Sequence, residues 1–235
     1  MKKSLCILLS SFISFNAFAQ KTEFRVALNS GLSSYAGNDA TDYSTFNINP
    51  TGQMSNVQNL YGTLKVLCFG VAAGVQYVNN KNFILGANIG FDQLRSKVLV
   101  EHKQSFECAA AQGYGFLSAQ FLNFNPFLGY RLGGNNISFD LKCGIDLGYF
   151  LNTNETTYLL DSNNSETLYS KTELNEKPLT IDVRPRLDFA VNYKKTGAFV
   201  SYAKDVSNYK HIKGYSEVEQ TNANIIRFGI SYQIN

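Results

Sequence analysis

Residues 137–151 read ISFDLKCGIDLGYFL, and this stretch decides the fold. Its odd positions are all apolar, whereas its even positions are mostly charged, small or polar. Side chains of a β-strand point alternately to opposite faces, so the stretch predicts one strand with an apolar and a polar face. The alternation is much longer than the roughly five to six residues of a usual soluble strand.

The same alternation recurs in seven further segments. Those strands are expected at about residues 23–32, 69–77, 83–92, 122–132, 181–193, 198–204 and 226–234. Short stretches rich in Asn, Gly and Lys, typical of tight turns, lie at 79–82, 133–136 and 194–197. Long polar connections are expected at 33–62, 96–114, 153–178 and 205–222. The pattern predicts an all-β, eight-stranded, antiparallel, up-and-down barrel.

Alternation alone does not say which face of the barrel points outward. A soluble barrel or sandwich, with its apolar face inside, is the alternative. Strands long enough to cross a bilayer, which needs about 9–11 residues, favour the apolar face outside. Aromatic residues on that face gather at the short-turn ends, as in an interfacial girdle: Phe24, Tyr77, Phe83, Tyr130, Phe139, Tyr193 and Tyr232. We therefore expect a closed transmembrane barrel, because an open sheet edge would leave unpaired backbone groups in lipid.

Residues 1–19, MKKSLCILLSSFISFNAFA, have the composition of a signal peptide. Lys2 and Lys3 precede an apolar run, and Ala17-Phe18-Ala19 forms a small-x-small cleavage site. The barrel domain is then residues 20–235, in the outer membrane of a Gram-negative bacterium with both termini periplasmic. Without the two leader lysines the net charge falls from +3 to +1, which gives no support for nucleic-acid binding.

The face opposite the apolar one carries charges of both signs. The expected inward cations are Arg25, Arg131, Lys142, Arg184, Arg186 and Arg227, and the expected inward acids are Asp92, Asp140, Asp146, Asp182 and Asp188. Eight strands enclose only enough space for side chains, and buried charges persist when paired. The near balance predicts a salt-bridged plug, since a selective pore usually carries an excess of one sign. An ion channel or proton path is the alternative.

Catalytic and metal-binding motifs are weak. His102, Glu101 and Cys108 form at best a loose cluster, without the spacing of a zinc site. Ser207, His211 and Glu217 share one loop and could form a hydrolytic trio, but polar loops supply such trios by chance. We expect no catalytic residue, no cofactor and no metal.

Removal of the leader leaves three cysteines. A disulfide between Cys68 and Cys108 is geometrically plausible if the loop that carries Cys108 folds over the barrel mouth. Cys143 falls on the apolar face and is expected to stay alone as a small apolar residue.

Three segments resemble the outer-membrane β-barrel proteins of Bacteroidota, including the PorT-like group, which share the architecture of small OmpA-like and OmpX-like barrels. They are the leader end Ala17-Phe18-Ala19 before Gln20, the stretch FNPFLGYR at 124–131, and RFGISYQI at 227–234. The last looks like the signal read by the barrel-assembly machinery, although Asn235 replaces the usual final aromatic residue. The resemblance implies outer-membrane lipid and that machinery as partners. Some PorT-like proteins are tied to secretion or gliding.

These observations predict a non-enzymatic membrane anchor. Its four long loops would serve adhesion, interaction or envelope integrity, with an extracellular or envelope protein as partner and no nucleic acid. A narrow transport channel or secretion-associated component is one alternative. A lipid hydrolase or acyltransferase at the outer rim is another.

Overall fold

The computed structural model describes residues 21–48, 54–101, 112–134, 136–160, 166–174, 180–209 and 221–235. In this part of the chain the regular structure consists of β-strands. The described residues contain no helix that is long and apolar enough to cross a bilayer.

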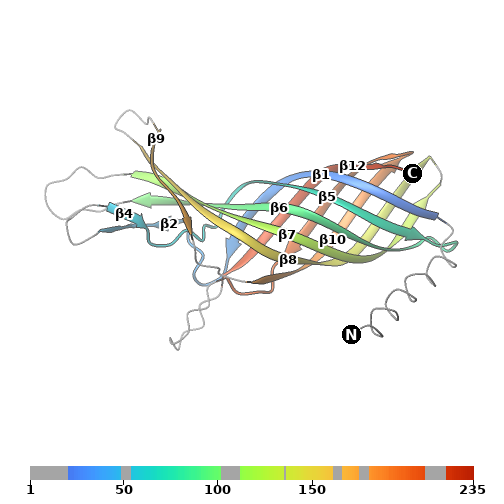
Figure 1. Cartoon of the computed structure of the whole chain (residues 1–235), viewed down its shortest axis with the longest axis horizontal. Coiled ribbons are helices and arrows are strands. Elements are labelled where there is room, and N and C mark those ends of the chain that lie inside the picture. The colour runs from blue at the N-terminus through green and yellow to red at the C-terminus, as the bar shows by residue number, and fades with distance from the viewer. Residues whose placement is uncertain are drawn as a thin grey trace, which may run out of the picture.

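Eight strands of the described chain form a closed antiparallel ring (Figure 1). They are β1 (Lys21–Ala36), β5 (Leu64–Val78), β6 (Phe83–Glu101), β7 (Gln112–Gly133), β8 (Ile137–Leu160), β10 (Ile181–Tyr193), β11 (Thr196–Lys204) and β12 (Asn222–Gln233). The first and last strands pair from Arg25↔Gln233 to Ala36↔Asn222, and β8 pairs directly with β10. The predicted eight-stranded barrel is confirmed.

The short turns lie at the end of the barrel that holds the C-terminus (Figure 1). Positive φ angles occur there at Asn82 (65°), Gly133 (103°) and Lys194 (52°). A left-handed residue lets two strands reverse within a tight turn, which the Asn-, Gly- and Lys-rich composition predicted. We call this end of the barrel the turn end, and the opposite end the outer end.

The outside of the ring is an apolar belt. Leu28, Leu128, Leu141 and Ile230 are each at least 60% exposed. At the turn end the predicted aromatic residues face outward, including Phe83 and Tyr193, which are 57% and 58% exposed. Cys143 is exposed within the belt, as expected. The alternative barrel with an apolar interior is therefore wrong for this ring.

Three strands continue past the ring at the outer end. The polar loops expected at 96–114 and 153–178 are wrong in part, because β6, β7 and β8 stay paired there, from Gln93↔Gln120 to Glu101↔Gln112 and from Gln120↔Asn152 to Gln112↔Leu160. Strand β9 (Glu166–Leu174) extends the sheet beside β8, and β2 (Tyr43–Ser44) runs parallel to β6. Strands β3 (Phe46–Ile48) and β4 (Met54–Val57) form a separate pair. We call this projecting sheet, at the left of Figure 1, the outer extension.

Even-numbered residues of β6 point inward along the whole strand, but the chemistry of its two faces reverses between the ring and the outer extension. Within the ring Phe91 points outward and Asp92 points inward, with 7% of its surface exposed. Farther along the same strand Val98 and Val100 point inward and are fully buried, whereas Lys97 points outward. Along β6 the ring is thus apolar outside and polar inside, whereas the outer extension is mainly apolar inside.

Strand β8 passes from the ring into the outer extension through a β-bulge. Phe121 pairs with Phe150 but Gln120 pairs with Asn152, so Leu151 is the extra residue. The buried set changes from even positions such as Asp146 to odd positions such as Thr153 at this point. One inserted residue therefore turns every later side chain of β8 to the other face.

Candidate functional site: the closed lumen

The interior of the ring holds all eleven charged residues that were predicted to face inward. Asp140, Asp182 and Arg184 are completely buried. The others lie on the same inward positions: Arg25, Asp92, Arg131, Lys142, Asp146, Arg186, Asp188 and Arg227. They divide into two groups at different heights in the barrel.

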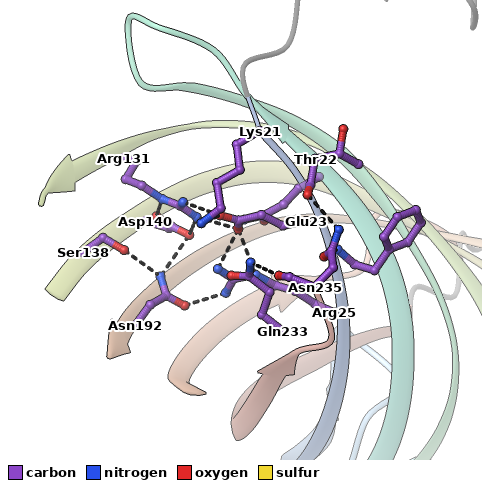
Figure 2. A network of polar contacts seen from close by, with 12 residues as sticks. Lys21, Thr22, Glu23, Arg25, Arg131, Ser138, Asp140, Asn192, Gln233 and Asn235 are labelled. Carbon is purple, nitrogen blue, oxygen red and sulfur yellow. Dashed lines mark hydrogen bonds and ion pairs between the residues drawn. The ribbon is translucent and has the colours of Figure 1, made fainter. Parts of the chain in front are cut away.

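The first group lies at the turn end around Glu23 (Figure 2). The Arg131 guanidinium bridges two carboxylates, with Nη1 2.7 Å from Glu23 Oε1 and Nε 2.7 Å from Asp140 Oδ1. Arg25 Nη2 lies 2.8 Å from Glu23 Oε2, and Arg25 Nη1 donates to Asn192 Oδ1 at 2.5 Å. Asn192 in turn donates to Asp140 Oδ2 at 3.1 Å. We call these five residues the turn-end cluster.

Glu23 was not among the predicted site residues, although it is fully buried at the centre of this cluster. It also accepts a hydrogen bond of 2.7 Å from Gln76 Nε2. The period of two places Glu23 on the same face as Arg25, and this signal was sufficient to find it. With Glu23 included, the described lumen contains six basic and six acidic side chains. The excess of one positive charge expected from the sequence disappears.

The second group lies closer to the outer end of the barrel. Arg227 Nη2 is 2.5 Å from Asp92 Oδ2, and Arg227 Nη1 is 3.2 Å from Asp146 Oδ2. Arg186 lies between two acids, with Nη1 3.3 Å from Asp146 Oδ1 and Nη2 2.7 Å from Asp188 Oδ1. These five residues, the mid-lumen cluster, connect β6, β8, β10 and β12 across the interior. A charge removed from water is tolerated when it is paired in this way.

Arg184 extends the mid-lumen cluster toward the outer end. Its Nε lies 3.0 Å from Asp182 Oδ2, and its Nη2 donates to Asn123 Oδ1 at 2.9 Å. Its guanidinium also packs 5.1 Å from the centre of the Phe121 ring. Gly148 makes room for this arrangement, because a Cβ there would lie 2.5 Å from Arg184 Nη2.

Between the two clusters lies a chamber of about 70 Å³. Its walls include Arg25, Asn125, Lys142 and Arg186. One water molecule needs roughly 10–15 Å³ of such space, so the chamber has room for only a few. Lys142 Nζ lies 5.0 Å from the centre of the Phe127 ring and has no carboxylate within 4.0 Å in the described residues.

Above the mid-lumen cluster the interior becomes aromatic. Tyr35 packs edge-to-face on Tyr61 and on Tyr209, with ring centres 5.1 Å apart in both pairs. Phe121 contacts Tyr209 at 6.4 Å and Phe150 at 5.7 Å. These five rings form a mouth cluster that fills the outer end of the barrel, and they join the buried apolar core that continues under the outer extension.

A short segment after β11 fixes Tyr209 in this position. Tyr209 Oη donates to Asp182 Oδ2 at 2.5 Å, and Val206 N–H donates to the Val183 carbonyl at 3.0 Å. Burial and, to a smaller extent, a hydrogen bond to Asp182 together raise the pKa of Asp205 to about 8. The Asp205 carboxyl is therefore neutral at pH 7. Residues 205–209, which we call the mouth segment, thus add no charge to the balanced lumen.

Most of the other residues considered as catalytic or metal-binding candidates lie outside the described part of the chain. His102, Cys108, His211 and Glu217 lie outside the described residues. The Ser207 hydroxyl accepts the Val183 N–H at 2.9 Å. Within the described ranges no group of three or more His, Cys, Asp or Glu side chains could hold a metal ion.

Cys68 is a buried free cysteine in the structure. Because its suggested partner Cys108 lies outside the described residues, the disulfide between them stays a prediction.

Comparison with solved structures finds other small barrels. The attachment invasion locus protein Ail of Yersinia pestis, solved alone and with the heparin analogue sucrose octasulfate, is 9% identical, with TM-scores of 0.37 and 0.36, and 92% of this chain covers 100% of it. Neisserial surface protein A is 8% identical, with a TM-score of 0.38 over 92% of this chain and 100% of that chain. The outer-membrane protease OmpT of Escherichia coli is 10% identical, with a TM-score of 0.38 over 92% and 97%.

No family model and no curated protein matches the chain. The PorT-like resemblance and the assignment to Bacteroidota are therefore still predictions. At such low identities and TM-scores the solved barrels carry no information on what this chain binds or does.

Proposed function

We propose that this protein is an outer-membrane anchor of a Gram-negative bacterium, without enzymatic activity, that holds its outer extension at the cell surface. The reversal of polarity along β6 carries the proposal. A strand with Phe91 outside and Asp92 inside suits lipid, and the same strand with Lys97 outside and Val98 inside suits water. The change between them would mark the outer boundary of the hydrocarbon.

Strand length supports the same assignment. Strand β7 has 22 residues and β8 has 24, whereas a strand needs only about 9–11 to cross a bilayer. The remaining residues would project from the membrane as the outer extension. Exposed lysines follow the apolar belt at the turn end, where they would meet lipid headgroups: Lys21, Lys81, Lys194 and Lys195.

The filled lumen favours an anchor over a transporter. Solute would have to pass the turn-end cluster, the mid-lumen cluster and the mouth cluster in turn. Separating a buried ion pair costs several kcal/mol per ion.

We further propose that residues 1–19 are a signal peptide, that residues 20–235 are inserted by the barrel-assembly machinery, and that both termini are periplasmic. The partner would then be an extracellular or envelope protein that contacts the outer extension.

Gel migration and fractionation test the location. The full chain, expressed in a Gram-negative host, is expected in the outer-membrane fraction and should migrate differently in detergent gels before and after boiling, because the closed ring resists detergent. Recovery of the folded protein in the soluble periplasmic fraction would overturn the proposal.

Cysteine labelling tests the orientation. Lys171→Cys in β9 and Lys195→Cys in the β10–β11 turn, each made in a Cys108→Ser/Cys143→Ser background that keeps only the buried Cys68, place one accessible thiol at each end of the molecule. A membrane-impermeant maleimide should label only the first in intact cells and both in lysed cells. Labelling of Lys195→Cys alone in intact cells would reverse the orientation.

A narrow channel is the second candidate, because the chamber, which Lys142 lines, is a polar cavity inside the barrel. Planar-bilayer recording separates the two functions. The anchor predicts no conductance steps in 1 M KCl, whereas reproducible steps that disappear in Lys142→Met would favour the channel.

A further inference from the structure

The apolar belt is followed at the outer end by a basic patch on the outside of β5 and β6. Lys65 lies two residues beyond Leu67 on β5, and Arg95 and Lys97 lie just beyond Phe91 on β6. The pairs Leu64↔Lys97 and Lys65↔Ser96 place the exposed Lys65 on the neighbouring strand, at the level of Arg95 and Lys97. We call Lys65, Arg95 and Lys97 the outer basic patch.

The outward positions nearest the belt carry no negative charge, and the nearest acids, Glu101 and the Glu166 that contacts Tyr114, lie farther toward the tip of the outer extension. The first outward positions beyond the belt on β5 to β8 carry no acidic residue: Lys65, Gln93, Arg95, Lys97, Gln120, Ser118, Phe116, Asn152, Asn154 and Thr156. In the part of the chain that the structure describes, none of the three cations forms an ion pair. Their charges are therefore available to a ligand.

Aromatic rings hold two of these cations against the sheet. Lys97 Nζ lies 4.0 Å from the centre of the Tyr114 ring, and the Arg95 guanidinium lies 4.9 Å from that of Phe116. A long side chain fixed in this way loses less conformational freedom when it binds an anion. The arrangement presents two preorganised cations, with the exposed Lys65 on the neighbouring strand.

The position of the patch relative to the apolar belt indicates which anion it would bind. Arg95 lies about 13 Å along β6 from Phe91, the residue of that strand at the outer edge of the apolar belt. Because strands in such barrels are tilted, this places the cations next to the outer boundary of the belt, at the level of lipid headgroups. We propose that the outer basic patch binds the phosphate groups of phosphorylated lipid headgroups in the outer leaflet. The inference rests on the proposed membrane location.

Native mass spectrometry tests the site on the full chain, refolded in a non-ionic detergent. The probes are lipid A with two phosphates, the same lipid after dephosphorylation, and inorganic phosphate. We expect the bisphosphorylated lipid to bind the wild type roughly tenfold or more tightly than it binds Lys65→Gln/Arg95→Gln/Lys97→Gln, since each cation near a charged headgroup contributes appreciably. Dephosphorylated lipid should not distinguish the two proteins.

A matched control removes the same charge from the opposite end. Lys21→Gln/Lys194→Gln/Lys195→Gln should retain the wild-type affinity. Equal binding by all proteins, equal loss in both triple variants, or complete competition by an equimolar amount of inorganic phosphate would each overturn the proposed site.

Heat-dependent gel migration verifies that each variant is folded. If the folded wild type fails to insert into phospholipid vesicles, the membrane location itself is wrong. If it inserts but the patch variant binds the lipid as tightly as the wild type, only the headgroup site is wrong.

Discussion

The ring and the outer extension share the strands β6, β7 and β8 but have different interiors. In the ring, the interior of β6, β7 and β8 contains Asp92, Arg131 and Asp146. In the extension, the interior of the same strands contains Val98, Leu117 and Thr157, each no more than 5% exposed. A strand has a fixed period of two, but its surroundings decide which chemistry belongs on each face.

The difference follows from the solvent on each side. A surface facing hydrocarbon gains nothing from burying apolar groups, so the ring can keep its apolar residues outside and its paired charges inside. A sheet in water is stabilised by removing apolar surface from solvent. The interior of the extension also contains an acid, Glu155, which is 2% exposed and accepts a hydrogen bond from the Val57 N–H at 3.3 Å. Burial raises the pKa of this carboxyl.

The largest expected effect comes from breaking the ionic interior of the ring. Arg131→Met leaves the buried Glu23 and Asp140 carboxylates without their shared partner, and should lower the free energy of unfolding by about 3–5 kcal/mol. Lys21→Gln is the control, because Lys21 contacts the same Glu23 at 3.1 Å from an exposed position and should cost no more than about 1 kcal/mol. Urea unfolding in lipid vesicles measures both. Similar small losses would mean that the lumen charges are not a structural network.

Breaking the apolar interior of the extension should have a local effect. Val98→Asp buries an unpaired charge at a fully buried position, with a cost of about 3 kcal/mol or more. The expected result is faster proteolysis of the extension with unchanged heat-dependent migration of the ring, whereas Lys97→Asp, one residue away on the outward face, should leave proteolysis unchanged. Loss of the ring in Val98→Asp would show that the two regions unfold as one unit.

Overpacking tests how closely the lumen is filled. Gly148→Ala places a methyl group 2.5 Å from Arg184 Nη2 and 2.9 Å from Asn123 Oδ1. A cost of about 1–3 kcal/mol is expected in urea unfolding. Gly134→Ala, whose Cβ would have nothing within 4 Å, should be close to neutral. A neutral Gly148→Ala would indicate a wider, hydrated interior.

The mouth segment should make stability depend gradually on pH. Between about pH 4 and pH 8 the folded protein keeps the Asp205 proton that the unfolded chain releases, so stability should fall as pH rises through this window and level off above it. The slope from this one group is at most about 1.4 kcal/mol per pH unit. Asp205→Asn should remove it, and Asp42→Asn, at an exposed position, should not. A pH profile unchanged by Asp205→Asn would contradict the neutral carboxyl.

Sequence reasoning located the ring well and the extension poorly. Strand β10 begins and ends at the predicted residues 181 and 193, because both of its faces keep the same chemistry throughout. Residues 153–160 of β8 were predicted to be a loop, because the bulge at Leu151 interrupts the period and the later residues are polar. Glu23 was missed only because the predicted strand was taken to begin at that residue.

The sequence by itself determined the number of ring strands, the positions of the turns and which residues share a face, because period two and turn chemistry are local properties. Only the tertiary structure decided which charges meet, since Glu23 and Arg131 are 108 positions apart and come together through ring closure. It also decided that Tyr209 fills the mouth and that three strands project beyond the ring. These features depend on packing against distant residues, which no local pattern records.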